Sequence, residues 1–349
     1  MEATASFATR DELIRNPEVQ RPHVVILGAG ASVASCLDGD KNGRRLPTMN
    51  NFVDILGLRD LLEKNGITDV HENFEALYSS LHSDPSRSSL TREIEKAVQD
   101  YFLSLELPDR PTVYDHLLLS LRRKDAVLTF NWDPFLFDAW IRNQRFGLPR
   151  IVFLHGNVRV ACCPSHPNRW GAHGVRCPEC GTKFVPVKLL YPVTFKNYPA
   201  DQYISSQWEA AKWFLENAFA LTIFGYGAPA SDVEAVDLMR TAWNADRRII
   251  ERVEIINIIL EDVLYETWKP FISHHHYDCR SCFYQSYIAN YPRRSGEALY
   301  IPSTQGRPAE QFPLQRESGF AELYSWLEPI AQYEREEKVL TKTIGQTQW

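Results

Sequence analysis

The sequence lacks a long apolar run: no stretch of 18 apolar residues occurs in its 349 residues, which argues against a membrane-spanning helix. Its first twenty residues contain no apolar core of the kind found in secretory signal peptides, so we expect a cytoplasmic protein. Excess positive charge is absent too, because 44 acidic residues outnumber 38 Lys and Arg and give a net charge of -6. We therefore expect neither direct nucleic-acid binding nor binding to an anionic membrane. Glycine (17) and proline (21) occur in ordinary numbers, which excludes collagen-like and low-complexity classes.

Cysteine is scarce. The chain has seven cysteines, an odd number and a low density for a secreted fold held by disulfides. Four of them form two C-x-x-C pairs, Cys177/Cys180 and Cys279/Cys282. In the reducing cytosol this spacing points to metal binding or redox chemistry before structural disulfides.

One of these pairs belongs to a pattern typical of a zinc site. Two residues separate Cys163 from His166, ten more follow, and Cys177 and Cys180 repeat the first spacing. Thiolate and imidazole ligands in two close pairs suit tetrahedral Zn2+, so we expect a structural zinc site. Cys162 could replace Cys163 as a ligand, and free thiols in a loop are the simpler alternative.

The second pair is open to several interpretations. Cys279 and Cys282 follow three histidines, His274–His276. The pair could be half of another metal site, a redox pair, a completion of the first site, or ordinary buried thiols. Ordinary thiols are favoured, because a lone pair is weak evidence for chemistry.

Short apolar runs alternate with helical patterns along the chain. The apolar runs are residues 23–27, 126–130, 151–154, 221–224 and 253–260. Helical periodicity covers residues 49–123, 132–144, 205–219 and 231–245. Strands that alternate with helices predict an α/β fold with a doubly wound, mostly parallel, Rossmann-like sheet.

This pattern divides the chain into three parts. Residues 1–21 form an N-terminal extension, 22–262 the sheet domain and 263–349 a C-terminal region with a possible interaction surface. The sheet domain carries a helical insertion (49–123) and a small cysteine-rich zinc insertion (160–190). An amphipathic helix within 310–341 is the candidate surface, although such a helix most often packs on its own core.

Polar or glycine-rich clusters follow four of the predicted strands. They are Gly28-Ala29-Gly30-Ala31-Ser32, Asn131-Trp132-Asp133, His155-Gly156-Asn157 and Gly225-Tyr226-Gly227-Ala228-Pro229-Ala230-Ser231-Asp232. Ligands of open α/β sheets bind beyond the carboxyl ends of the strands, so we expect these clusters to converge on one pocket.

Each cluster also has a purely structural interpretation. The glycine turn could be a tight turn without a ligand, and Val33 stands where the dinucleotide fingerprint has glycine or alanine. Asn131 and Asp133 could cap a helix, and a lone histidine such as His155 is as often a core residue as a base.

Taken in order, the clusters resemble the sirtuin superfamily of NAD-consuming enzymes. The matching elements are Gly28-Ala29-Gly30-Ala31-Ser32, Thr129-Phe130-Asn131-Trp132-Asp133, Leu154-His155-Gly156, the cysteine-bearing insertion and Gly225-Tyr226-Gly227. The resemblance covers residues 22–262 and implies that this region is an NAD-binding catalytic domain.

The resemblance also implies residue roles. The NAD phosphates would be held by Gly28, Ala29, Gly30 and Ser32, and the adenosine half would be contacted by Gly225, Gly227 and Asn257. Asn131 and Asp133 would line the nicotinamide-ribose pocket, and His155 would be the general base acting on a ribose hydroxyl.

Departures from the protein deacylases of this family indicate a different acceptor. Phe130 stands in place of their glutamine, Val33–Leu37 in place of their Pro-Asp-Phe-Arg, and Leu189–Pro192 in place of their Phe-Gly-Glu strand. NAD-binding features persist while acyl-lysine features fade. The resemblance is therefore to the divergent bacterial antiphage-defence branch of NAD hydrolases.

We accordingly expect an NAD glycohydrolase that yields nicotinamide and ADP-ribose and is held inactive until triggered. The alternatives are an NAD-dependent protein deacylase or ADP-ribosyltransferase, and a non-catalytic sensor of NAD or ADP-ribose. Control by assembly suggests a homo-oligomer, and the resemblance adds a HerA-type ATPase or a short Argonaute as possible partners.

Overall fold

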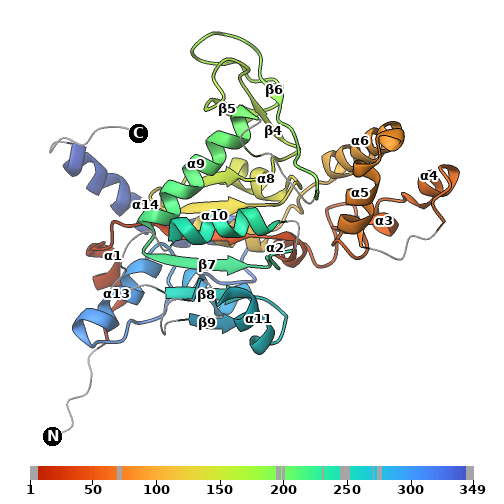
Figure 1. Ribbon diagram of the computed structural model, residues 1–349. Coiled ribbons are helices and arrows are strands. Elements are labelled where there is room, and N and C mark those ends of the chain that lie inside the picture. Colours follow the sequence, from red (N-terminus) through yellow and green to blue (C-terminus); the bar gives the residue numbers. More distant parts are fainter. Residues whose placement is uncertain are drawn as a thin grey trace, which may run out of the picture.

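The computed structural model describes residues 7–68, 73–193, 198, 201–229, 232–243, 252–269, 271–272 and 277–342. Figure 1 shows a central sheet with helices packed on it, a helical region beside one end of the strands, and a small second sheet. No helix in the described ranges has the length and apolar character that a membrane crossing requires.

The central sheet has six strands, which all pair in parallel. They are β1 (His23–Leu27), β2 (Ala126–Thr129), β3 (Arg150–Phe153), β7 (Ala220–Phe224), β8 (Arg252–Ile256) and β9 (Tyr277–Arg280). Their order is β3-β2-β1-β7-β8-β9. All five residues of β1 are buried, as expected for a strand covered on both faces. The predicted doubly wound parallel sheet is confirmed.

Two details of the sheet differ from the prediction. The apolar run 253–260 leaves the sheet at Ile256, and its last residues form a loop in which Ile258 is 93% and Leu260 77% exposed. Strand β9 was not predicted, because its sequence Tyr-Asp-Cys-Arg is short and half polar. An edge strand packs on fewer neighbours, so its sequence carries a weaker apolar signal.

The crossover helices cover both faces of the sheet. They are α2 (Ala29–Ser35), α7 (Val113–Leu119), α8 (Phe135–Arg142), α9 (Gln202–Asn217), α10 (Val233–Trp243) and α11 (Glu261–Trp268). The chain moves from β1 to β3 in one direction and from β7 to β9 in the other. Right-handed crossovers then place α7 and α8 on the face opposite α10 and α11. Residue 231 and residues 244–245 of the predicted helix 231–245 lie outside the described residues.

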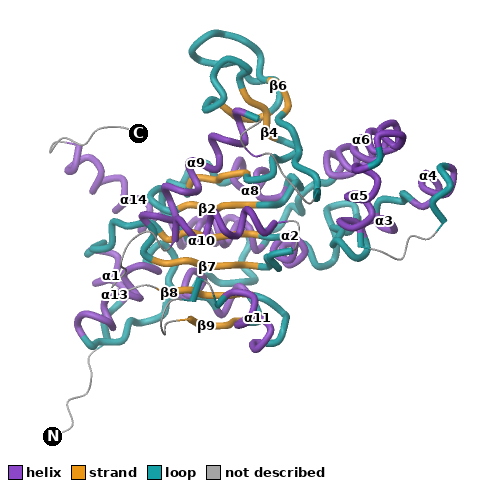
Figure 2. Tube along the Cα trace, viewed as in Figure 1, coloured by secondary structure: helices purple, strands orange, loops and turns teal. Residues whose placement is uncertain are grey.

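The part of the predicted helical insertion that precedes α7 stands beyond the carboxyl ends of the strands (Figures 1 and 2), whereas α7 packs on the sheet. It contains α3 (Phe52–Ile55), α4 (Arg59–Lys64), α5 (Phe74–Ser83), the 3-10 turn Pro85–Arg87 and α6 (Ser88–Ser104). The rings of Phe52 and Phe74 stack with their centroids 4.1 Å apart, which fixes α3 against α5.

The cysteine-rich insertion forms the small antiparallel sheet. Its strands are β4 (Val160–Cys162), β5 (Trp170–Ala172) and β6 (Val185–Pro186), in the order β5-β4-β6. Loops make up most of this segment (Figure 2).

Both ends of the described chain pack together. Helix α1 (Arg10–Arg15) lies beside α13 (Ser295–Gln305) and α14 (Phe320–Lys342), with η4 (Phe283–Gln285) and α12 (Tyr287–Asn290) preceding them. Arg294 is fully buried and donates to the carbonyl of Leu13 and to Glu334. The apolar stripe of α14, including Leu323 and Leu327, is buried, so this helix packs on its own core. Residues 1–6 and 343–349 lie outside the described residues.

Candidate functional site

The first part of the site is a close approach between two loops at the carboxyl ends of β1 and β7. A Cβ on Gly28 would lie 2.5 Å from the Cα of Tyr226, and Gly225 adopts a φ of +61°. The amide of Gly28 donates to the carbonyl of Phe224 at 3.1 Å, and the amide of Gly30 donates to that of Gly225 at 2.9 Å. Loop packing therefore requires these glycines and uses two of their amides. Their role in holding phosphates stays a prediction.

A buried polar network links this turn to the end of β2. The Asn131 amide nitrogen donates to the Gly28 carbonyl at 2.8 Å and to the Ser32 hydroxyl at 2.9 Å. Ser32 in turn donates to Asp133 at 2.5 Å and lies 2.7 Å from the Tyr114 hydroxyl. The network fixes the rotamer of Asn131, whose side-chain oxygen accepts no hydrogen bond from the described residues.

Asp133 sits at the centre of this network and has an unusual titration. Burial raises its pKa to about 6, although hydrogen bonds from Ser32 and the Phe135 amide oppose the shift. The bond from the Phe135 amide, 3.1 Å long, satisfies the first amide of α8, whose N-cap residue is Pro134. Asp133 thus supports the start of the helix without being its N-cap, and its other carboxylate oxygen faces Ser32.

His155 follows β3 and is enclosed by aromatic rings. Phe130 meets the imidazole edge-on at 4.8 Å, and Tyr198 lies nearly parallel to it at 6.2 Å. The side chain is 7% exposed, and its Nε2 is 3.8 Å from Oδ1 of Asp232. Tyr226, which stacks on Phe130 at 4.3 Å, donates its hydroxyl to Asp232 at 2.9 Å.

The turn after His155 depends on Gly156. This glycine has a φ of +78°, and a Cβ there would lie 2.1 Å from the carbonyl oxygen of Lys188. The Leu190 amide donates to the His155 carbonyl at 3.0 Å. The segment that leaves the cysteine-rich insertion is therefore pinned against the histidine.

These groups open into a cavity of about 250 Å³ at the carboxyl ends of β1, β2, β3 and β7. Eight of the ten residues predicted for catalysis or NAD binding line it: Gly28, Ala29, Ser32, Asn131, Asp133, His155, Gly225 and Gly227. Gly30 and Asn257 do not. Asn257 accepts hydrogen bonds from the amides of Ile258 and Ile259 and so caps its own loop, and its contact with adenosine stays a prediction.

The cavity lining combines acidic and apolar side chains. Its charged lining consists of Glu75, Asp133 and Asp232, and no Lys or Arg contributes among the described residues. The apolar lining comes mainly from the helical insertion and the segment after the cysteine-rich insertion, with Leu46, Pro47, Met49, Phe52, Phe102, Trp132, Leu190 and Pro192. The indole N–H of Trp132 is buried and has no hydrogen-bond partner in the described part of the chain.

Several lining residues were not singled out from the sequence. Asp232 stands in the cluster after β7, where its position was a signal, but it was given no role. Glu75 lies in α5, where no sequence pattern distinguishes it from a solvated helix charge. Tyr114 belongs to the buried network around Ser32 rather than to the cavity lining, and it too was given no role.

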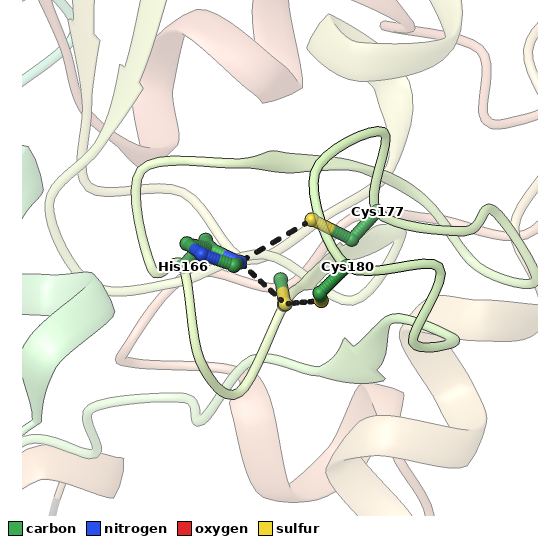
Figure 3. A group of neighbouring side chains, drawn as sticks. His166, Cys177 and Cys180 are labelled. Carbon is green, nitrogen blue, oxygen red and sulfur yellow. Dashed lines mark hydrogen bonds between the residues drawn. The ribbon is translucent and has the colours of Figure 1, made fainter.

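The four predicted zinc ligands meet at one point of the cysteine-rich insertion. Figure 3 shows three of them, His166, Cys177 and Cys180, pointing toward one another. One ligand atom from each of Cys163, His166, Cys177 and Cys180 lies within 4.8 Å of the other three. Cys163 Sγ is 3.5 Å from Cys180 Sγ, and Cys177 Sγ is 3.5 Å from His166 Nδ1. Tetrahedral zinc with ordinary bond lengths places such atoms roughly 3.5–3.8 Å apart. The four side chains therefore fit a structural zinc ion.

Neighbouring groups favour the metal-binding forms of His166 and Cys180. The Nε2 of His166 is 3.3 Å from Glu179, which leaves Nδ1 for a metal. Hydrogen bonds from Thr182 lower the pKa of Cys180 to about 6 and so favour the thiolate that binds metal.

The geometry favours Cys163 over the adjacent Cys162. Cys163 belongs to the cluster, whereas Cys162 lies on β4 in the main hydrophobic core. Cys279 is on β9 and Cys282 is exposed, and neither joins a metal-ligating group in the described residues. His274–His276 lie outside the described residues.

Comparisons with known proteins give structural likeness only. No family model and no curated protein matches the chain. A Sir2 homologue in complex with NAD aligns with 16% identity and a TM-score of 0.39, over 84% of this chain and 92% of that one. A mutant Sir2 homologue bound to ADP-ribose aligns with 16% identity and a TM-score of 0.40, over 83% and 92% of the two chains. Likeness at this level does not establish a common family.

Proposed function

We propose that the protein is an NAD hydrolase that cleaves the bond between nicotinamide and ribose and releases nicotinamide and ADP-ribose. The observation that carries this proposal is the convergence of Asn131, Asp133 and His155 in a cavity whose charged lining is entirely acidic among the described residues. Breaking this bond develops positive charge on the ribose. Carboxylates fixed beside that charge stabilise the transition state more than the ground state.

The two kinds of lining suit the two sides of the reacting bond. The aromatic nicotinamide ring suits the apolar lining, which includes Phe52, Phe102 and Trp132. The ribose would lie between Asn131 and His155. Asn131, held by Ser32 and Gly28, has its side-chain oxygen free of donors from the described residues and so able to orient a ribose hydroxyl or the attacking water.

The reaction balances with these groups alone. The C–N bond breaks with its electron pair passing to the nicotinamide nitrogen, which neutralises the pyridinium ring. A water oxygen bonds to the ribose carbon and gives up a proton. A ribose hydroxyl takes up this proton while His155 removes the hydroxyl's own proton, so the released proton ends on His155. No peptide is needed as acceptor.

Zinc would take no part in these steps. Cys163, His166, Cys177 and Cys180 would hold it, and none of them lines the cavity. Zinc would stabilise the fold of the cysteine-rich insertion. The segment after this insertion contacts His155 through the Leu190 amide.

Uncontrolled hydrolysis would deplete the cell of NAD, so the activity fits a regulated effector such as an antiphage-defence protein. Assembly into a homo-oligomer, or contact with a HerA-type ATPase or short Argonaute, would supply the trigger. These partners rest on the resemblance described above.

Incubation of the purified protein with NAD alone, followed by chromatography of the products, tests the proposal. We expect nicotinamide and ADP-ribose in equal amounts. Asn131→Ala and His155→Ala should each lower the rate by at least about a hundredfold, the range for loss of a hydrogen-bonding group that acts in the transition state and of an acid-base group. His82→Ala, an exposed histidine of α5, is the matched control and should retain the wild-type rate.

Other outcomes would separate the alternatives. Products that appear only when an acylated or acceptor peptide is added would indicate a deacylase or transferase. NAD binding by calorimetry without turnover, even with candidate partners, would indicate a sensor. A protein that does not bind NAD would contradict the proposal and both alternatives.

A further inference from the structure

Asp232 is a buried acid that faces the histidine of the cavity. It lies immediately before α10, is 4% exposed, and places Oδ1 3.8 Å from Nε2 of His155. Its second oxygen accepts the Tyr226 hydroxyl at 2.9 Å. A carboxylate withdrawn from water is costly unless polar or charged groups compensate it. The Tyr226 hydroxyl and the imidazole are two such groups.

The surrounding rings leave the imidazole little freedom. Phe130 meets it edge-on and Tyr198 lies parallel to it, so the ring plane is fixed while Nε2 points toward Asp232. A hydrogen on Nε2 then faces a carboxylate, which favours the tautomer that carries it. The 3.8 Å separation exceeds a hydrogen bond but is a distance at which opposite charges attract strongly in a buried site. Such contacts commonly tighten when a substrate binds.

We infer that Asp232 is a positioning residue for His155: it fixes the tautomer and orientation of the imidazole and stabilises its protonated form, which makes His155 a stronger base. This inference rests on the proposed role of His155 as the base. It extends that role by naming the group that gives the histidine its basicity. The hydrogen bond from Tyr226 partly neutralises the charge of that carboxylate and so moderates its effect.

Other titratable groups around Asp232 and His155 determine how much the basicity of His155 depends on Asp232. Tyr226 follows β7 and Tyr198 lies beside the ring, and burial raises the pKa of both well above their usual range, so each remains neutral. Asp133 at the end of β2, Glu75 of α5 and Glu234 of α10 add further acids near the site. Because these acids persist when Asp232 is replaced, we expect the basicity of His155 to fall without collapsing.

The direct test is the pKa of the His155 imidazole, measured by NMR in protein with isotope-labelled histidine. His155→Gln identifies the resonance. We expect Asp232→Asn to lower that pKa by about one unit or more, the range for loss of an adjacent opposite charge, and Asp232→Glu to restore part of it. Tyr226→Phe, which keeps the carboxylate but removes its donor, should raise the pKa by a few tenths. Asp237→Asn, an exposed acid of the same helix, is the matched control.

The NMR readout needs no turnover, so it separates this inference from the proposed function. A folded Asp232→Asn protein whose His155 titrates as in the wild type overturns the inference, even if NAD is hydrolysed. If Asp232→Asn does not fold, an unchanged His155 pKa in Tyr226→Phe and Asp232→Glu would count against it. In an active protein, the acidic limb of the pH–rate profile should move down by the same amount as the NMR pKa.

Discussion

At the scale of single residues, the site is a set of side chains whose usual solvation has been removed. Asp133 is the clearest case, because burial raises its pKa to about 6 while Ser32 and the start of α8 hold it in place. The types and spacing of Asn131, Asp133 and His155 could be recognised from the sequence because each follows a strand. Their depth of burial, and the acids Asp232 and Glu75 beside them, depend on chain segments far away in sequence. No local pattern could supply that information.

The raised pKa of Asp133 predicts that replacing this residue by asparagine gives a more stable but inactive protein. Its pKa in the folded state lies above the unfolded value of 3.8, so the folded state binds the proton more tightly, and stability is lost as the pH rises from 4 toward 6. Asp133→Asn should remove this loss. We expect its free energy of unfolding to exceed that of the wild type by about 2–3 kcal/mol at pH 8 and to match it near pH 4.

Urea unfolding at the two pH values measures this difference. Asp237→Asn serves as the exposed control and should show no pH-dependent gain. The same Asp133→Asn protein should have lost NAD turnover, because a residue kept charged at a cost in stability is expected to serve function. Equal stabilisation at both pH values would contradict the account of Asp133.

At the scale of elements, the cysteine-rich insertion is joined to the site by the segment that follows it. Lys188 and Leu190 contact Gly156 and His155, and Leu190 lines the cavity. The ligand spacing was readable from the sequence because zinc knuckles are local. The contact with His155 was not, since it depends on how the insertion folds back onto the sheet. Strand β9 shows the same limit, because its pairing partner rather than its composition makes it a strand.

Loss of one zinc ligand should therefore disturb the cavity indirectly. We expect the purified wild type to carry about one zinc per chain and Cys177→Ser almost none, because structural sites of this kind need all four ligands. Cys177→Ser should also lower NAD turnover several-fold by loosening the segment over His155. Cys279→Ser is the matched control and should keep its zinc. Atomic emission measures the zinc content per chain in each protein. Full zinc occupancy in Cys177→Ser would contradict the assigned ligands.

At the scale of the whole molecule, the parallel sheet and its crossover order bring distant loops to one edge. The alternation of apolar runs and helices predicted this sheet, because burial on both faces leaves a clear apolar signal. The position of the helical insertion over that edge was not predictable, since its apolar faces show only that it packs, not against what. The same holds for the chain ends. Arg294 is buried and donates hydrogen bonds to both Leu13 and Glu334, although an arginine is expected on the surface from its sequence alone.

The central claim is that NAD binds at the carboxyl ends of β1, β2, β3 and β7, and a crystal structure of the Asn131→Ala protein with NAD tests it most directly. This variant should bind NAD but turn it over too slowly to consume it. The account predicts the nicotinamide ring against the apolar lining beside Trp132, with the ribose between position 131 and His155. NAD bound elsewhere on the protein, or with its adenine in place of the nicotinamide beside Trp132, would contradict the account.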